Sequence, residues 1–506
     1  MNILFVLYGD FSSNSSIPLA LYARELSKAG HLCVITVPLN LETDEQHQNR
    51  SFTPVLYETV LADPFSVFPN GRPADVIHAC TPREYVRRFV TSYQSRITTP
   101  LIIALEDNER WITEKAFDLD ASSLNQFTNQ ELSEKLLGGL SHPGYVDSFT
   151  GLADSVVVVQ DKLKPTVPPW VPCETVMIGI DFDLLTPRLP DITLRNRLGI
   201  AKGDKVIVYH GGLNKFVRES IKSLCVAVGI INQRGMAVKL LRTGPMPLDF
   251  RDDLSPEANT AIIELGVVSR SELPDLLALA DVFVQPGSNN SFEDLRLSSK
   301  LPEFLAMGKP VVMPDINIAY LFKDHVNSCL LKIGSAEEIA EKCMTLFSNP
   351  DVAEQIGKAG KKLAEQFFDA KKQSLLLEQI YLMAIEKFDF TKASEVWKNT
   401  STGNALYTGL LTRFKQLQIS GLSLVNQDAN KMMVAYNNQL EINLNRINDL
   451  ELRITNQNAQ ITQLQEEVDK AESIKNYLES VLQSTSWRLT SPLRMLKQFF
   501  DHSASK

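Results

Sequence analysis

The sequence has no long hydrophobic run. None of its apolar stretches reaches the ~20 residues that a helix needs to cross a bilayer, which argues against a membrane-spanning chain. The N-terminal stretch MNILFVLYGD also lacks a basic segment ahead of its short apolar run. This pattern is typical of a first β-strand and not of a signal peptide.

Cysteine is scarce, and its spacing is irregular. The six cysteines show no Cys-x-x-Cys or Cys/His pattern: Cys33, Cys80, Cys173, Cys225, Cys329 and Cys343. This argues against a zinc site or a disulfide framework and favours a reducing cytoplasm. A net charge of −9 also argues against nucleic acid as a partner, because phosphate backbones attract basic surfaces.

The composition is that of a globular protein. Hydrophobic residues make up 44% of the chain, and the mean hydropathy is −0.08. A chain of 506 residues is too long for one hydrophobic core, and its length predicts about three units.

Residues 2–180 alternate short apolar runs with amphipathic segments such as Ile17–Ala29 and Pro82–Tyr93. The runs are ILFVLY (3–8), LCVITVP (32–38), DVIHA (75–79), PLIIAL (100–105), SVVVVQ (155–160) and TVMIGI (175–180). Short apolar strands separated by helices predict a parallel sheet that is covered on both faces. Ligands bind such sheets beyond the carboxyl ends of the strands. The residues at those ends are Gly9, Asp10, His78, Glu106 and Asp107.

The pattern restarts after a linker over 181–203. The second set of runs is KVIVYHGG (205–212), AVKLLRTG (237–244), AIIELGVV (261–268), DVFVQPG (281–287), PVVMP (310–314) and SCLLKI (328–333). The fold class that we predict is therefore α/β, with two Rossmann-like domains facing across a cleft.

The stretch FEDLRLSSKLPEFLAMGKPVVMP (292–314) predicts a helix with a clear start and end. Ser299 suits the N-cap, and Gly308 suits a left-handed C′ residue. Lys300 at the helix N-terminus favours an anion such as phosphate, and Glu303 could accept hydrogen bonds from sugar or ribose hydroxyls. The alternative is a surface helix whose Lys300 and Glu303 are merely solvated.

Several motifs in order carry a resemblance to a known family. The segments LADSVVVVQDKL, VIVYHGGL, LLRTG, ELGVVSRSELPDLLALADVFVQPG and KLPEFLAMGKPVV resemble the retaining nucleotide-sugar glycosyltransferases of family 4. The resemblance spans roughly residues 1–385 and is strongest over 205–315. It implies the GT-B fold, a donor site mainly in the second domain, an acceptor site mainly in the first, and no metal or other cofactor.

The family's E-x7-E motif is only half present. Its second glutamate falls on Glu303, which would hold the nucleotide ribose, but its first falls on Leu295. Glu293 and Asp294 are the neighbouring carboxylates that could replace it.

The family's phosphate-binding cations are also altered. The usual Gly-Arg pair is Gly211-Gly212 here, Arg218 stands at the lysine position, and Lys215 is the nearest replacement for the missing cation. Negative charge develops on the departing diphosphate, and the resemblance gives its stabilisation to Arg218, Lys300 and the N–H groups near Ser298 and Ser299.

Three further positions match residues that pack around the phosphate loop and the base: Gly244, Val268 and Leu273. They could equally be ordinary turn and core residues. Arg218 has the alternative of a solvated residue on a helix over Val217–Ile230.

In the first domain, Glu106-Asp107 stands where relatives often have a His-Asp pair facing the acceptor. These carboxylates could act as a base or bind hydroxyls, or they could cap the following helix. His78 resembles the histidine of the family's strand end, although a lone histidine there is more often structural. Gly9 and Asp10 match the family's first loop loosely.

The C-terminal region predicts a coiled coil. Apolar residues recur every seven positions, with a second set three residues later: Leu440, Ile447, Ile454, Ile461 and Val468, then Leu450, Leu464, Ala471 and Leu478. β-Branched residues in the first set and leucines in the second favour a parallel homodimer through 440–482. A single long helix packed on its own catalytic domain is the alternative.

The last residues predict a basic amphipathic helix. Leu489, Leu493, Leu496 and Phe500 form one stripe, flanked by Trp487 and three basic residues. This pattern over 485–500 suits the inner-membrane surface, or else a partner protein. The string STSWRLTSPLR also looks like a tail that recurs in bacterial polysaccharide-assembly glycosyltransferases.

Together these features predict a cytoplasmic, peripheral hexosyltransferase that moves a sugar, with retention, from a nucleoside diphosphate to a lipid-linked or surface glycan. The alternatives are a non-catalytic scaffold of a glycan-assembly complex and another GT-B activity such as an epimerase or phosphorylase. The predicted regions are the acceptor domain (1–185), donor domain (204–370), crossover helix (371–390), helical linker (391–435), coiled coil (436–484) and basic tail (485–506).

Overall fold

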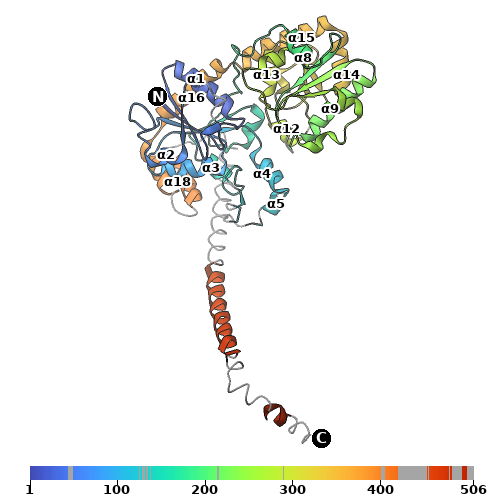
Figure 1. Cartoon of the computed structure of the whole chain (residues 1–506). Helices are drawn as coiled ribbons and strands as arrows, with labels where there is room; N and C mark the ends of the chain where they lie inside the picture. Colours follow the sequence, from blue (N-terminus) through green and yellow to red (C-terminus); the bar gives the residue numbers. More distant parts are fainter. Residues whose placement is uncertain are drawn as a thin grey trace. The chain divides into compact units, whose positions relative to one another are not determined.

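The computed structural model forms two compact units, Met1–Met433 and Val434–Lys506 (Figure 1). It describes residues 1–43, 50–124, 126–127, 131–132, 135–136, 138–213, 216–288, 290–400, 405–419, 453, 455–477, 479–480 and 493–498. Lys215, one of the predicted phosphate-binding cations, lies outside these ranges.

The first lobe of the larger unit is built on seven parallel strands in the order β3-β2-β1-β4-β5-β6-β7. Their bounds are Asn2–Val6 (β1), Leu32–Val37 (β2), Thr53–Leu56 (β3), Val76–Cys80 (β4), Leu101–Leu105 (β5), Ser155–Val158 (β6) and Cys173–Thr175 (β7). The central strands β1, β4 and β5 are buried throughout, which explains their uninterrupted apolar sequences.

Both edges of this sheet differ from the sequence prediction. The strand expected over 175–180 ends at Thr175, and a single bridge from Ile180 to Asp369 follows it. Strand β3 was not predicted, because its residues are half-exposed or exposed and include Pro54. Proline is confined to edge strands, where a missing N–H donor breaks no ladder.

Helices cover the first sheet. They are α1 (Ser16–Lys28), α2 (Tyr57–Ala62), α3 (Glu84–Gln94), α4 (Glu109–Phe117), α5 (Ala121–Leu124), α7 (Val146–Thr150) and the 3-10 helix η2 (Asp161–Thr166). A helix from much later in the chain, α16 (Ala370–Lys387), packs against α1 (Figure 1). Leu377, Ile380 and Tyr381 of α16 are buried in the same core as Phe5.

The second lobe contains six parallel strands in the order β10-β9-β8-β11-β12-β13. Their bounds are Lys205–Tyr209 (β8), Val238–Arg242 (β9), Ile262–Glu264 (β10), Val282–Val284 (β11), Val311–Pro314 (β12) and Cys329–Leu331 (β13). The predicted α/β class with parallel sheets is therefore confirmed.

The helices of the second lobe include the predicted phosphate-site helix, α13. They are α8 (Ile192–Arg197), α9 (Arg218–Gln233), η3 (Leu248–Arg251), α10 (Pro256–Ala261), α11 (Leu273–Ala278), α12 (Ser291–Leu295), α13 (Lys300–Ala306), η4 (Asn317–Leu321), α14 (Ala336–Ser348) and α15 (Pro350–Phe367).

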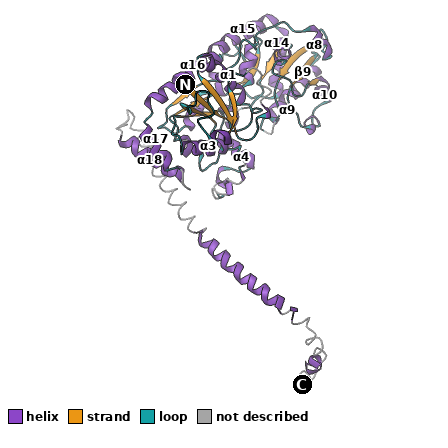
Figure 2. Ribbon diagram, turned by 60° about the vertical axis from the view of Figure 1, so that its left-hand side comes forward, coloured by secondary structure: helices purple, strands orange, loops and turns teal. Residues whose placement is uncertain are grey.

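Two further helices, α17 (Phe390–Lys398) and α18 (Ala405–Ile419), return to the first lobe (Figure 2). Arg413 on α18 donates to the carbonyls of Leu152 and Ala153 at 2.6 and 2.7 Å, and Phe414 meets Trp170 edge-on. The first lobe is thus completed by chain that follows the second.

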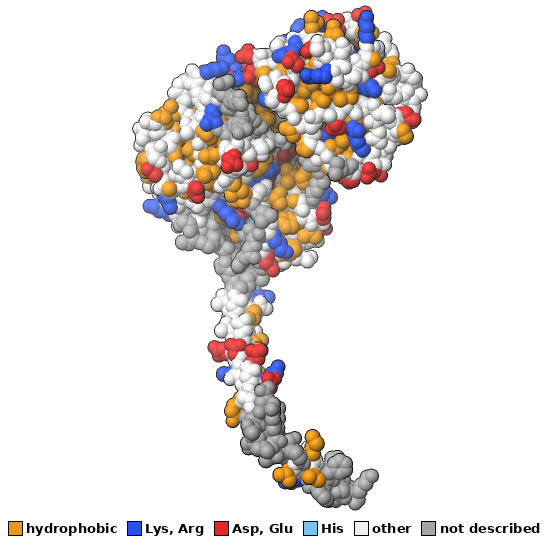
Figure 3. Space-filling view, in the orientation of Figure 1, with side chains coloured by type: hydrophobic (Ala, Val, Ile, Leu, Met, Phe, Trp, Pro, Cys, Tyr) orange, Lys and Arg blue, Asp and Glu red, His pale blue; other side chains and the backbone are white. Residues whose placement is uncertain are grey.

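The smaller unit is helical over residues 455–477. Three of the apolar heptad residues of the predicted coiled coil are exposed there: Ile461, Leu464 and Val468 (Figure 3). The other apolar heptad residues apart from Ala471 lie outside the described residues, and the dimer stays a prediction. Residues 493–498 are also helical, and no helix in the described ranges is long and apolar enough to cross a membrane.

Candidate active site

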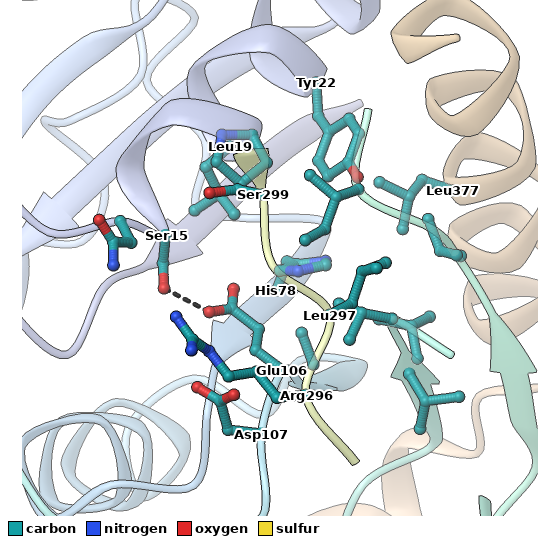
Figure 4. Close-up of a pocket in the computed structure, with 18 residues that line it drawn as sticks. Ser15, Leu19, Tyr22, His78, Glu106, Asp107, Arg296, Leu297, Ser299 and Leu377 are labelled. Carbon is teal, nitrogen blue, oxygen red and sulfur yellow. Dashed lines mark hydrogen bonds between the residues drawn. The ribbon is translucent and has the colours of Figure 1, made fainter. Parts of the chain in front are cut away.

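A cavity opens beside the carboxyl ends of β4 and β5 and the start of α1, and α12–α13 contributes its other wall (Figure 4). Its polar lining residues are Asn14, Ser15, His78, Glu106, Asp107, Arg296 and Ser299. Its remaining lining residues are almost all apolar and include Leu19, Val157, Val176, Ile178, Leu297 and Leu377. The structure thus brings the predicted acceptor-side carboxylates together with the predicted donor-side helix.

Glu106 and Asp107 follow β5 directly and point into the cavity (Figure 4). Burial raises the pKa of Glu106 to about 7, against a hydrogen bond from the Ser15 hydroxyl. Burial also raises the pKa of Asp107 to about 6, and Arg296 is the charge that most opposes this rise. The pair is therefore poised to exchange protons or bind hydroxyls near neutral pH.

The alternative role for this pair, capping the next helix, is wrong. The Asn108 side chain caps α4 by accepting from the Trp111 N–H at 3.1 Å. The two carboxylates are therefore left facing the cavity.

Replacement of Glu106 by glutamine is expected to stabilise the protein at pH 8 but not at pH 4. The folded pKa of about 7 lies above the unfolded value, so the folded state holds more protons and loses stability as pH rises from about 4.5 to 7. Above pH 7 the ionised Glu106 lowers the free energy of unfolding of the wild type by its full amount, up to about 3 kcal/mol. Glutamine cannot ionise and can still accept from Ser15.

Urea unfolding of both proteins at the two pH values measures this difference. Glu58→Gln, at an exposed residue of α2, is the matched control. A variant that is less stable than the wild type at pH 8 would contradict the electrostatic account of Glu106.

His78 lines the cavity, and its ring also contacts two side chains of the core of the first lobe. Its Nδ1 lies 2.7 Å from the Tyr381 hydroxyl, and its ring lies 5.4 Å from that of Phe5. Burial lowers its pKa to about 3, so the ring is neutral. These contacts fit a positioning role in the wall of the cavity, where His78 joins β4 to α16.

Gly9 and Asp10, the other predicted acceptor-side residues, do not line the cavity. Asp10 closes a local turn, because its carboxylate accepts from the Ser12 N–H at 2.9 Å and from the Ser12 hydroxyl. The structure therefore does not place Gly9 or Asp10 in the cavity wall that Glu106 and Asp107 form.

On the donor side, α13 begins at Lys300 and ends near Gly308, whose φ of +68° is left-handed as predicted. Ser299 occupies the N-cap position, but its side chain makes no capping hydrogen bond. The Ser298 hydroxyl oxygen is buried without a hydrogen-bond partner among the described residues. Polar groups at this helix start are therefore free to meet a ligand.

Glu303 is the most strongly held carboxylate of the site. His210 Nε2 lies 2.7 Å from one of its oxygens, and Arg270 lies 2.5 Å from the other. Burial by itself would raise the pKa of Glu303, but Arg270 and then His210 outweigh it and hold the pKa at about 2. Glu303 is therefore always ionised at neutral pH and accepts hydrogen bonds only.

The sequence analysis missed both partners of Glu303. His210 and Arg270 follow β8 and β10, so each lies where ligand-binding residues of a parallel sheet are expected. That position was the available signal. The residues next to His210 and Arg270 in the sequence do not predict a contact with Glu303.

Lys300 passes over the backbone of Gly211. A Cβ at Gly211 would lie 2.1 Å from the Lys300 Cε, and the φ of Gly211 is +115°, so only glycine fits there. Burial, and then the neighbouring Arg296, lower the pKa of Lys300 to about 8. At neutral pH the ammonium group is charged, and it makes no ion pair within the described part of the chain.

Gly212, in the loop after β8, lies against Gly244, in the loop after β9. A Cβ at Gly244, whose φ is +87°, would lie 2.5 Å from the Gly211 carbonyl carbon, so the loops after β8 and β9 touch only because both are glycine-rich. Val268 is half-buried beyond β10, and Leu273 is buried at the start of α11.

Arg218 does not line the cavity. It is the first residue of α9, pairs with Asp249 at 2.8 Å and lies over the ring of Phe250. About a third of its side chain is exposed. This arrangement favours the solvated-helix alternative over a direct role in the cavity.

The two carboxylates beside Leu295 differ in availability. Asp294 is engaged, because it pairs with Lys162 of the first lobe at 2.5 Å and accepts from the Asn317 N–H. Glu293 is buried, which raises its pKa, while Arg296 acts in the opposite direction. Glu293 is therefore the better placed to act near Lys300.

One cluster in the described ranges has metal-ligand spacing: Asp324, His325 and Cys329, whose ligand atoms lie within 4.8 Å of one another. The Lys342 ammonium lies 3.0 Å from both His325 Nε2 and the Asp324 carboxylate. A cation is thus already present in the cluster, which does not line the cavity.

The chain matches known proteins in sequence. Residues 204–349 match the family model described as glycosyl transferases group 1. Over 201 residues the chain is 24% identical to EpsD of Bacillus subtilis (strain 168), a provisionally named glycosyltransferase. That match covers 38% of this chain and 50% of EpsD, so the chain spans about half the length of this curated relative.

Solved structures share the fold. Anabaena Alr3699/HepE, in complex with UDP and glucose, gives a TM-score of 0.58 at 15% identity and covers 75% of this chain and 99% of its own. Sucrose-phosphate synthase (tll1590) from Thermosynechococcus elongatus gives 0.55 at 15% identity, covering 77% and 100%. The chain thus has GT-B-like structural neighbours, and its residues 204–349 form a glycosyltransferase group 1 domain.

Proposed function

We propose that this protein transfers a sugar, with retention, from a nucleoside diphosphate to a hydroxyl of a glycan or lipid-linked acceptor. The observation that carries this proposal is that the cationic start of a helix of the second lobe and two carboxylates of the first lobe lie on opposite sides of one cavity. Lys300 supplies a charged ammonium without an ion-pair partner in the described residues, and it follows Ser299, which lines the cavity opposite Glu106 and Asp107. Holding an unpaired, largely desolvated cation costs stability, which is typical of a functional site.

The donor would occupy the second lobe. The α13 N-terminus and Lys300 suit a diphosphate, because free N–H groups, the helix dipole and the ammonium all favour negative charge. Glu303 lies one turn further along α13 and would accept from ribose hydroxyls. Structures of HepE with UDP-glucose and with UDP and glucose support a nucleotide-sugar donor for this fold.

In the reaction, the bond between the anomeric carbon and the diphosphate oxygen breaks, and a bond from that carbon to the acceptor oxygen forms. Lys300 stabilises the charge that collects on the diphosphate. Glu106 and Asp107 bind the acceptor hydroxyl and hold it on the face of the sugar ring from which the diphosphate departs, as retention requires. The acceptor proton passes to the departing phosphate, so no protein nucleophile and no metal ion are assigned.

The acceptor side supports an amphiphilic substrate. The Glu106 and Asp107 carboxylates line the cavity together with Leu19, Val157, Val176 and Leu377. The basic amphipathic tail predicted over 485–500 would hold the enzyme at the inner leaflet, where lipid-linked glycans are built.

Thermal unfolding of the full chain with UDP, GDP and dTDP tests the proposal. A nucleotide at a hundred times its dissociation constant is expected to add about 2.7 kcal/mol to the stability of the unit that binds it. We expect one base to be preferred, its sugar conjugate to stabilise as well, and AMP to serve as the unrelated control. Stabilisation by none of the diphosphates would overturn the proposal in favour of the non-catalytic scaffold.

A further inference from the structure

We infer that Arg296 is the second cation of the diphosphate site, taking over from the arginine that is absent at Gly212. The inference rests on the proposed function and deepens it, because it assigns a specific residue to the donor's leaving group. Arg296 stands one position after Leu295, where the glutamate of the family motif is missing, and it has no counterpart among the residues predicted from the sequence.

The position of Arg296 is set by both lobes. It ends α12, and α12 is fixed to the first lobe by the Lys162–Asp294 pair and by Phe292, which stacks on Trp111 with ring centroids 4.2 Å apart. The backbone of Arg296 is therefore held in place by a helix that contacts the first lobe. Figure 4 shows its guanidinium group pointing toward the Glu106 and Asp107 carboxylates.

The guanidinium group is available to a ligand. Among the described residues it makes no hydrogen bond or ion pair; it lies over the Phe292 ring at 5.6 Å, and its charge opposes the rise that burial causes in the pKa of the nearby Asp107 and Glu293 carboxyls. The other arginines of this lobe's strand ends are committed: Arg242 to Glu264 at 2.9 Å and Arg270 to Glu303 at 2.5 Å. A guanidinium with free donors is well suited to bidentate phosphate binding.

Arg296 and Lys300 act on the same space. Arg296 lowers the pKa of Lys300 more than any other neighbouring charge does, and Glu303 and Glu293 act in the opposite direction. Two repelling cations that share a site are unfavourable until an anion of comparable charge enters between them. A nucleoside diphosphate supplies such an anion, whereas a neutral sugar does not.

The two family cation positions that the structure describes carry no cation directed at the cavity. A Cβ at Gly212 would lie 3.3 Å from the Pro245 ring, so a side chain there would require the ring to shift by a few tenths of an ångström. Arg218 is turned to Asp249. The structure thus relocates the positive charge to Arg296, where it also faces the acceptor-side Asp107.

Isothermal titration of the full chain with UDP, GDP and dTDP, and with the matching monophosphates, tests this inference. For the diphosphate that the wild type binds, Arg296→Gln is expected to weaken affinity by about 10- to 100-fold, as for loss of a charge-assisted phosphate contact. The monophosphate should change much less, because it lacks the terminal phosphate. Arg296→Lys, which keeps the charge, should retain most of the affinity.

The matched control is Arg188→Gln, which removes an arginine that is paired with Asp275 away from the cavity. Unchanged diphosphate affinity in Arg296→Gln would overturn the inference, as would an equal loss for the monophosphate or a loss carried by Arg218→Gln instead. Thermal unfolding without ligand shows whether each variant is folded. If the wild type binds no diphosphate, the proposed function fails first, and this result differs from a failure of Arg296 alone.

Discussion

Replacing Lys300 with methionine is expected to slow sugar transfer by about 10²- to 10³-fold and, at the same time, to stabilise the folded protein at pH 7. Both effects follow from the proposed role of Lys300. Its ammonium group is charged and poorly solvated beside Arg296, which destabilises the fold, and the diphosphate is the anion that it would bind. Methionine fills a similar volume and carries no charge.

The stability effect has a defined pH window. The folded pKa of about 8 lies below the unfolded value of about 10.4, so the unfolded state binds more protons between these values. Wild-type stability therefore rises as pH increases from 8 to about 10.4, and below pH 8 the full cost is present. That cost is at most about 3 kcal/mol, and the partial exposure of the side chain reduces it.

Urea unfolding at pH 7 and pH 10 measures the predicted gain, which should shrink at the higher pH. Lys358→Met, at an exposed lysine of α15, is the control and should change little. For transfer, loss of one charge-stabilising group typically costs about 10²- to 10³-fold in kcat. A Lys300→Met variant that transfers sugar at the wild-type rate would contradict the leaving-group role.

Replacing Glu303 with glutamine is expected to have the opposite effect on stability and to weaken nucleotide binding. The carboxylate is 6% exposed and is held by Arg270 and His210, so its loss leaves the Arg270 charge without its anion. Glutamine keeps the shape but can balance no charge. Charge-assisted hydrogen bonds to ribose would be lost as well, which predicts about 10- to 100-fold weaker binding.

The sign follows from the depressed pKa. Glu303 has a folded pKa of about 2, below the unfolded value of about 4.3, so its contribution is present above about pH 4.5 and is lost as pH falls toward 2. At pH 7 this contribution is about 3 kcal/mol. Wild type and Glu303→Gln should therefore differ in urea unfolding at pH 7 and converge near pH 2.

A double-mutant cycle with Arg270→Gln measures the interaction free energy between Glu303 and Arg270 separately from the effect of each single substitution. If the two side chains interact as the structure shows, the double variant should lose less stability than the sum of the single variants. Glu341→Gln, at an exposed carboxylate of α14, controls for charge removal alone. Wild-type nucleotide affinity in Glu303→Gln would rule out the ribose role.

The predictions that came closest to the structure rest on local chemistry. Uninterrupted apolar runs predicted the buried strands β1, β4, β5 and β8, because a strand covered on both faces has no polar positions. Helix α13 lies between Ser299 and Gly308 as predicted. The left-handed Gly308 follows its end, whereas Ser299 holds the N-cap position without a capping hydrogen bond. Where the signal was weak, as at β3, the edge position and Pro54 removed the apolar pattern.

The sequence by itself determined the parallel α/β architecture, the position of helix α13 and the carboxylates at the end of β5. Only the tertiary structure decided which charges meet: His210 and Arg270 on Glu303, and Arg296 beside Lys300. The physical reason is that these groups leave different strand ends, and their partners are set by strand order and loop path. A periodic pattern indicates which face of a helix or strand is buried. It does not indicate which side chain of another element lies opposite that face.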